Sequence, residues 1–277
     1  MIRVRALWAS SHPGPTCVVT ALSLALGIVS GLEPWRLALL AAAVFFGQLS
    51  VGISNDAIDA ARDRAVGRTD KPIARGDVGL RTAWVTALGA LVVALALSAP
   101  LGWRMLLAHA ILLASAWSYN AGLKKTAFSI VPFLLSFGLL PSVATLSSAD
   151  PVPAPIWAGI AGAVLGAAVH LANVLPDLDD DRRTGVRGLP HRIGATASAV
   201  LAALGVIGGG VAVLVGSADG AVAPLAWVFF AAVVAVAVAA AVAALRRQPG
   251  RNVFRLVMLA ALLLAVQLIA TGGSLIP

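Results

Sequence analysis

Residues 54–78, SNDAIDAARDRAVGRTDKPIARGDV, place five aspartates and five lysines or arginines within a chain that is otherwise mostly apolar. A second stretch, NVLPDLDDDRRTGVRGLPHRIG at residues 173–194, repeats the pattern. Aligned on their asparagines, the two stretches match at Asn55 and Asn173, Asp59 and Asp177, Asp63 and Asp181, Arg64 and Arg182, and Gly67 and Gly185. The same arrangement of polar groups is therefore built twice.

The composition around these stretches is that of an integral membrane protein. Of the 277 residues, 60% are hydrophobic and 12% are charged, and the mean hydropathy is +0.94. The apolar runs are roughly 17 to 25 residues long, which is enough for an α-helix to cross a hydrocarbon core about 30 Å thick. Strands of an outer-membrane barrel are shorter and alternate between apolar and polar residues, so the runs predict helices.

These runs predict an all-α bundle of nine transmembrane helices. They lie at residues 16–32, 36–54, 82–99, 103–119, 127–147, 155–175, 194–216, 221–245 and 253–275. The two aspartate-rich motifs follow the second and the sixth run. No soluble segment longer than about 30 residues separates the runs, so residues 1–277 are predicted to form a single polytopic membrane domain.

The basic residues predict the orientation of the bundle. If nine spans alternate across the membrane, 18 of the 20 Lys and Arg residues fall on one side, and only Arg36 and Arg104 fall on the other. The positive-inside rule then places the N-terminus and both motifs in the cytoplasm and the C-terminus outside, in the cell membrane if the protein is bacterial. The same bias accounts for the net charge of +8 without any nucleic-acid motif. We therefore expect membrane lipid and an anionic substrate as partners, and no nucleic acid.

The spacing within each motif predicts a shared helix face. Asn55, Asp59 and Asp63 recur every four residues, and a step of four residues rotates a helix by only about 40°. If the predicted helices at 36–54 and 155–175 continue into the cytoplasm, both motifs lie on parallel extensions. Their polar faces can then meet across a cavity.

Carboxylates crowded in this way repel one another unless a cation binds between them. Oxygen ligands without His or Cys suit Mg²⁺ better than zinc or copper, and Mg²⁺ commonly completes its shell with substrate phosphates. Basic residues predicted on the same side can bind phosphate oxygens: Arg68, Lys71, Arg75, Lys124, Lys125, Arg183 and Arg187. A plain solvated loop is the alternative, but the positive-inside rule explains only the basic residues and leaves the repeated acids unexplained. The pattern favours a metal-bridged polyphosphate site at the mouth of an apolar cavity.

The motifs resemble those of the UbiA superfamily of intramembrane prenyltransferases, whose hallmark is N-D-x-x-D-x-x-x-D followed by a basic segment ending in proline. The resemblance covers nearly the whole chain. It rests on NDAIDAARD with Asn55, Asp56, Asp59 and Asp63, on GRTDKP, on DLDDD with Asp177 and Asp181, and on YNAGLKK with Tyr119, Leu123 and Lys124. Lys71 departs from the family, which commonly has Arg before this proline.

The resemblance implies two Mg²⁺ ions that bridge the diphosphate of an isoprenyl donor. The implied metal ligands are Asn55, Asp59, Asp63, Asp177 and Asp181, to which the repeated pattern adds Asn173. The residues expected to bind the diphosphate are Arg68, Lys71, Tyr119, Lys124, Arg183 and Arg187, and those expected to be catalytic are Asp59, Asp63, Asp177, Asp181 and Lys124. The roles of Asp56, Asp179, Asp180 and His170 stay open.

The implied reaction is Mg²⁺-dependent ionisation of the donor to an allylic carbocation, which a small acceptor captures, usually through an aromatic ring carbon in this superfamily. A membrane-embedded terpene cyclase is the first alternative, because some members let the donor's own double bonds capture the cation. A transporter of cations or phosphate compounds is the second. Against it, the acids cluster at one membrane face and the spans carry no ladder of charges. The acceptor, the donor chain length and the oligomeric state are not written in the motifs.

Overall fold

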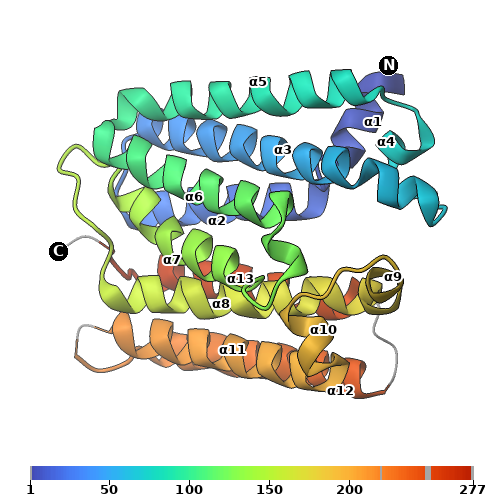
Figure 1. Ribbon diagram of the computed structural model, residues 1–277. Helices are drawn as coiled ribbons and strands as arrows, with labels where there is room; N and C mark the ends of the chain where they lie inside the picture. Colours follow the sequence, from blue (N-terminus) through green and yellow to red (C-terminus); the bar gives the residue numbers. More distant parts are fainter. Residues whose placement is uncertain (1, 219, 247–250, 276–277) are drawn as a thin grey trace.

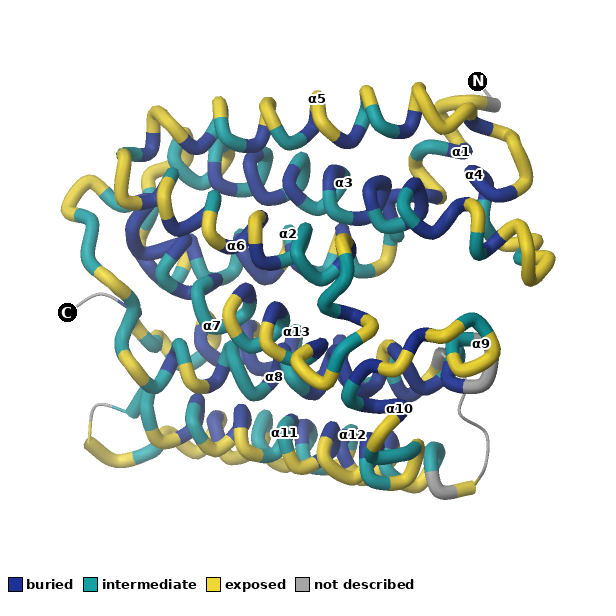
Figure 2. Tube along the Cα trace, in the orientation of Figure 1, coloured by how far each residue is buried: buried dark blue, intermediate teal, exposed yellow. Residues whose placement is uncertain are grey.

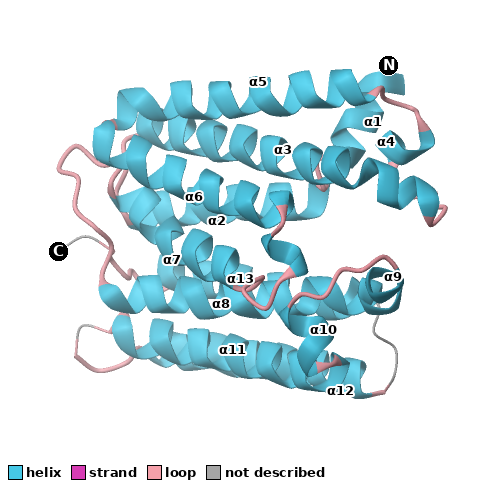
Figure 3. Cartoon of the chain, in the orientation of Figure 1, coloured by secondary structure: helices cyan, strands magenta, loops and turns pink. Residues whose placement is uncertain are grey.

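A computed structural model describes residues 2–218, 220–246 and 251–275 of the chain. Within those residues the secondary structure is helical, with no strand. Figures 1 and 3 show the long helices lying side by side along one common axis, with most of the short helices at one end of the bundle. The predicted all-α class is therefore confirmed.

Long helices occupy every predicted apolar range that the structure describes. They are α2 (Pro13–Val29), α3 (Pro34–Ala65), α5 (Leu80–Ser98), α6 (Trp103–Ala121), α7 (Val131–Thr145), α8 (Ile156–Val174), α11 (Ala195–Gly216), α12 (Pro224–Leu245) and α13 (Arg251–Ala270). Short helices connect them: α1 (Ile2–Ser10), α4 (Pro72–Arg75), η1 (Ala99–Leu101), η2 (Leu123–Lys125), η3 (Leu175–Asp177), α9 (Leu178–Arg183) and α10 (Leu189–Ile193).

Six of these helices are long and apolar enough to cross a membrane by themselves, namely α3, α5, α8, α11, α12 and α13. The pair α1 and α2, bent by 65°, makes a seventh if it counts as one span. Helix α7 has only 15 residues, fewer than any of these six. The number of nine spans therefore stays a prediction, while a multi-pass helical membrane protein agrees with the structure.

The bundle turns apolar side chains outward as well as inward. Figure 2 shows exposed residues along the outer side of α5, and Val85 and Val92 on this helix are 65% and 66% exposed. A lipid environment accounts for such exposed apolar side chains, which would be costly as one large surface in water. Buried clusters fill the space between helices, with Leu40, Met105 and Val143 in one of them.

Glycines allow two close approaches that shape the site. A Cβ atom at Gly162 in α8 would lie 2.2 Å from the Phe137 carbonyl oxygen in α7, so these helices touch through their backbones. A Cβ atom at Gly52 in α3 would lie 2.4 Å from the Ser11 carbonyl oxygen, at the bend between α1 and α2. The bend is therefore held directly against α3, one turn before the first motif.

A 3₁₀ turn interrupts the regular α-helix within the second motif, so the placement of this motif on one helix face stays a prediction. Helix α8 ends at Val174, and η3 and then α9 carry the chain onward. Pro176 explains the break, because it has no N–H to donate and its ring crowds the carbonyl four residues earlier. The first motif meets the expectation, since α3 continues without interruption to Ala65.

Candidate active site

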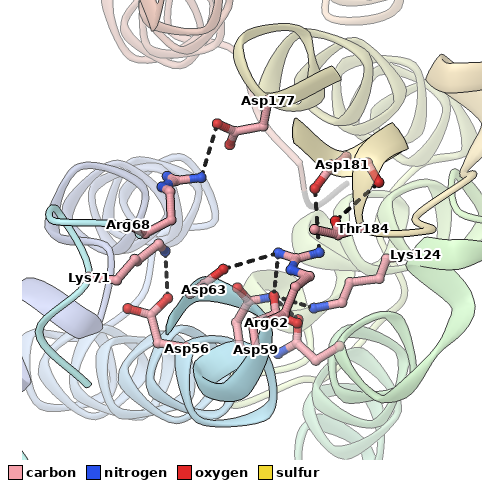
Figure 4. A network of polar contacts seen from close by, with 12 residues as sticks. Asp56, Asp59, Arg62, Asp63, Arg68, Lys71, Lys124, Asp177, Asp181 and Thr184 are labelled. Carbon is pink, nitrogen blue, oxygen red and sulfur yellow. Dashed lines mark hydrogen bonds and ion pairs between the residues drawn. The ribbon is translucent and has the colours of Figure 1, made fainter. Parts of the chain in front are cut away.

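The two aspartate-rich motifs face each other at one end of the bundle. The first lies on the last turns of α3, and the second lies on η3 and α9 (Figures 1 and 4). Two arginines from the first stretch connect them. Arg62 approaches Asp181 at 3.4 Å, and Arg68 approaches Asp177 at 3.2 Å. The predicted meeting of two polar faces is therefore present in the fold.

Arg62 lies at the centre of this cluster (Figure 4). Its guanidinium is 3.1 Å from Asp59, 3.5 Å from Asp63 and 3.4 Å from Asp181, so three carboxylates from both motifs converge on one cation. Asp59 and Asp63 are buried, with 7% and 3% of their surface exposed. Such carboxylates need a positive partner, and Arg62 supplies it in this arrangement.

Lys124 joins the cluster from another helix. The 3₁₀ turn η2 after α6 brings its ammonium within 2.6 Å of Asp59, and the side chain is buried. Burial lowers the pKa of the Lys124 ammonium from its ordinary value, and the Asp59 carboxylate opposes that shift. The predicted catalytic lysine therefore lies against the predicted metal ligand.

Asn55 is oriented by a second asparagine. Its amide nitrogen donates to Asn120 Oδ1 at 2.8 Å, and Asn120 donates in turn to the Val51 carbonyl at 2.9 Å and to Ser54 Oγ at 3.1 Å. This chain of hydrogen bonds uses the donor side of the Asn55 amide. The Asn55 oxygen, which is the atom a metal ion would bind, is left for another partner.

Asp56 has a different environment from the other aspartates. It is 2% exposed, and its Oδ1 accepts from Lys71 at 2.6 Å and lies 2.9 Å from His12 Nε2. His12 has a left-handed backbone conformation, with φ of 55°, at the bend between α1 and α2. Asp56 therefore ties this bend and the segment before α4 to α3. Lys71, predicted to bind diphosphate, is engaged by Asp56.

The remaining predicted residues are distributed around the cluster. Arg68 is paired with Asp70 at 2.8 Å as well as with Asp177. Asn173 is exposed, as are Arg183 at the end of α9 and Arg187 in the following loop. The side chains of Asp179 and Asp180 lie outside the described residues.

A cavity of about 200 Å³ opens beside the cluster, among α2, α3, α6, α7, α8 and α13. Asn55, Asn173 and Tyr119 belong to its wall, together with apolar side chains such as Leu22, Leu140 and Met258. Tyr119 packs against Phe133, with ring centroids 5.1 Å apart, and both rings line the cavity. The charged cluster and an apolar chamber therefore adjoin, as the sequence predicts.

The donor set fits a hard divalent cation. Within the described residues, no group of three His, Cys, Asp or Glu side chains forms a ready metal centre. However, Asp59, Asp63 and Asp181 already converge on the Arg62 guanidinium, which is a cation, and these three donors are carboxylates. A nitrogen donor is also at hand, since His191 Nε2 lies 3.3 Å from Asp181. A Mg²⁺ ion bound by these carboxylates would take the place that Arg62 now occupies.

Sequence reasoning missed Arg62, Asn120 and His12 at this site, as well as His191 beside Asp181. Arg62 stands between two aspartates of the motif, and its position three residues after Asp59 on a helix was an available signal. Asn120 lies inside the YNAGLKK segment, but no local pattern indicates its contact with Asn55. His12 reaches Asp56 only because the bend before α2 packs on α3, which no sequence period reveals.

Comparison with known proteins places the chain among intramembrane transferases. A model of the UbiA prenyltransferase family matches residues 15–267, whereas curated proteins gave no match. The fold is similar to an apo UbiA homolog from Aeropyrum pernix K1, with a TM-score of 0.77 at 19% identity over 92% of this chain and 97% of that one. It is similar to a UbiA homolog from Archaeoglobus fulgidus bound to GPP and Mg²⁺, with a TM-score of 0.73 at 17% identity over 96% and 98%. It is also similar to a digeranylgeranylglyceryl phosphate synthase, with a TM-score of 0.71 at 14% sequence identity over 98% of this chain and 99% of that chain.

Proposed function

Because the chain belongs to the UbiA prenyltransferase family, we propose that it transfers an isoprenyl group from a polyprenyl diphosphate to a small, aromatic acceptor. One observation carries this proposal: carboxylates of both motifs converge on a single cation beside an apolar cavity. A diphosphate with its metal ions needs the first feature, and an isoprenoid tail needs the second.

We infer that Asn55, Asp59, Asp63, Asn173, Asp177 and Asp181 hold the metal. The Archaeoglobus homolog with bound GPP and Mg²⁺ supports this choice of cation. Two ions are proposed because two motifs contribute ligands. When bound, Mg²⁺ neutralises the diphosphate and makes it a better leaving group.

The chain's own residues then have distinct tasks. Lys124 and Arg68 bind diphosphate oxygens, with Lys71, Arg183 and Arg187 nearby at the same end of the bundle. The cavity excludes water from the cation, and the aromatic rings of Tyr119 and Phe133 in its wall stabilise the positive charge. The allylic C–O bond breaks, the diphosphate leaves with the electron pair, and a ring carbon of the acceptor forms the new C–C bond and loses its proton.

The terpene cyclase alternative uses the same ionisation without an acceptor. The cavity carries polar side chains, including Gln48, deep among its apolar ones. A polar acceptor could use such side chains, whereas a cyclase that only folds an isoprenoid chain would need an apolar cavity, so the lining favours the transferase. A transporter would bind the diphosphate and move it without cleaving it.

Turnover by protein in lipid nanodiscs tests the proposal. The protein is given Mg²⁺ and geranyl, farnesyl or geranylgeranyl diphosphate, with and without aromatic acceptors, and diphosphate release and organic products are measured. A prenylated adduct supports the transferase, cyclic products without an acceptor indicate the cyclase, and uncleaved donor moved across the bilayer indicates a transporter.

Removal of a proposed ligand gives the matching prediction. Asp59→Asn and Asp177→Asn should each lower turnover by more than about 100-fold, because the metal loses a negatively charged carboxylate ligand while the side-chain size is kept. Asp150→Asn, an exposed aspartate in the loop between α7 and α8, is the control and should retain full activity. Full turnover in either ligand variant would remove the basis for the metal site.

A further inference from the structure

Gln48 is the deepest free polar group in the cavity wall. It lies on α3 seven residues before Asn55, which corresponds to about 10 Å along the helix axis from the aspartate cluster toward the membrane interior. Its side chain is half-buried and makes no hydrogen bond within the described part of the chain. A free amide at such a depth needs a partner, since an unpaired polar group in an apolar chamber is costly.

Most other polar side chains along the cavity are already engaged. Thr16 donates to the Ser11 carbonyl at 2.7 Å, and Ser136 donates to the Leu112 carbonyl at 3.2 Å. Asn55 and Asn120 bind each other. Besides Gln48, the lining residues without such a bond in the described chain are Tyr119 and Asn173, which both lie at the cluster end. Gln48 therefore stands alone in the deeper part.

The described residues that line the cavity include no Lys, Arg, Asp or Glu. Among these lining residues His12 is the one basic side chain, and it is held against Asp56 at 2.9 Å. The cations at the mouth also have anionic partners, Lys71 with Asp56 and Lys124 with Asp59. A carboxylate entering the deep part would lose its water without gaining a counter-ion.

We propose that Gln48 binds the acceptor and that the acceptor is uncharged at the end remote from its reacting carbon, carrying a hydroxyl or carbonyl group there. An amide can donate to and accept from such a group, so it satisfies a neutral partner without a net charge. The proposal rests on the proposed transferase function, because it places the reacting carbon toward the diphosphate and the polar group toward Gln48. Gln48 is a specificity-determining residue in this reading.

Matched acceptors test this directly. Wild-type protein in nanodiscs is titrated with para-hydroxybenzyl alcohol and with para-hydroxybenzoate, and with the equivalent pair on a naphthalene ring, first by calorimetry without donor and then in turnover. We expect the neutral member to bind at least about tenfold more tightly in each pair and to have the higher kcat/KM. Equal or tighter binding of the carboxylates would overturn the proposal.

A single substitution tests the residue. Gln48→Leu keeps the volume and removes the hydrogen bonds, so acceptor kcat/KM should fall about tenfold while the donor KM stays within about twofold. Gln267→Leu on α13 is the matched control, since this glutamine is fully buried and lies outside the cavity lining. Unchanged acceptor kinetics in Gln48→Leu would overturn the role of Gln48.

The experiments distinguish a failure of the Gln48 inference from a failure of the proposed transferase function. Adducts that form with carboxylated acceptors in both wild type and Gln48→Leu would overturn this inference and leave the transferase standing. Mg²⁺-dependent diphosphate release that yields cyclic products, with no adduct from any acceptor, would overturn both.

Discussion

Arg62 illustrates how a single side chain can complete a site that its neighbours define. It contacts Asp59 and Asp63 on its own helix and Asp181 on α9, so it joins the two motifs where a metal is proposed to bind. Its distances of 3.1 to 3.5 Å are longer than the 2.6 Å of the Lys124 pair. Arg62 is therefore an internal counter-ion of these carboxylates, and a metal ion bound to them as proposed would have to displace it.

Loss of this counter-ion should strengthen metal binding. Arg62→Gln should lower the Kd for Mn²⁺, used as a spectroscopic substitute for Mg²⁺, by about tenfold, because the ion no longer competes with the guanidinium. The metal-free variant should also unfold at a lower temperature than wild type, since buried carboxylates lose their partner. Electron paramagnetic resonance and thermal unfolding with and without Mn²⁺ measure the two effects.

Arg64→Gln is the control for this prediction. Arg64 lies two residues further along α3, but its guanidinium donates to the Ala74 carbonyl at 3.1 Å instead of to a carboxylate. Its removal should leave Mn²⁺ affinity unchanged. Weaker Mn²⁺ binding in Arg62→Gln would mean that the arginine supports the metal site and does not compete for it.

The contact between α7 and α8 is a close approach of two helix backbones. Gly162 and Gly166 of α8 lie against the α7 backbone, and the same part of α7 carries Phe133 and Phe137 into the cavity wall. The spacing of four residues places both glycines on one face of α8. This face brings the aromatic wall close to His170 and Tyr119, as Phe133 is 4.8 Å from His170 between ring centroids.

A methyl group at this crossing should force the helices apart. Gly162→Ala should destabilise the protein by about 1–3 kcal/mol. The added Cβ would clash with the Phe137 carbonyl oxygen, which belongs to the backbone and cannot move aside by a side-chain rotation. Thermal unfolding in detergent or nanodiscs measures the change. Gly89→Ala in α5, where a Cβ meets nothing within 4 Å, should instead stabilise the protein by up to about 1 kcal/mol through helix propensity. Equal stability of the two variants would contradict the close-packing argument.

Most of the charged side chains gather at one end of the molecule, and only a few, such as Arg36 and Arg104, lie at the other. Figure 1 shows both motifs, α1 and the N-terminus at one end of the bundle, and the C-terminus at the other. Lys and Arg are concentrated at the motif end, which the positive-inside rule assigns to the cytoplasm. Termini at opposite ends agree with an odd number of crossings.

Accessibility to a membrane-impermeant thiol reagent in cells tests this topology. In a Cys17→Ser background, Thr69→Cys beside the first motif should be labelled only after the membrane is permeabilised, while Ala149→Cys in the loop between α7 and α8 should be labelled in intact cells. Both positions are exposed in the fold, so burial does not limit the reaction. The reverse pattern would place the active site outside.

The sequence alone determined the helical membrane fold, the repeated Asn and Asp positions, and the family, because long apolar runs and fixed residue spacing are local properties that need no knowledge of packing. Pro176 was also visible, although its break in the second motif went unpredicted. Only the tertiary structure decided that Arg62 stands between the motifs, that Asn120 orients Asn55 and that Asp56 is engaged by Lys71 and His12. The same holds for Gln48, which among the described residues is the one polar side chain without a hydrogen bond in the deep cavity. These contacts join residues that are far apart in the sequence, and whether a given side chain finds a partner depends on how whole helices pack.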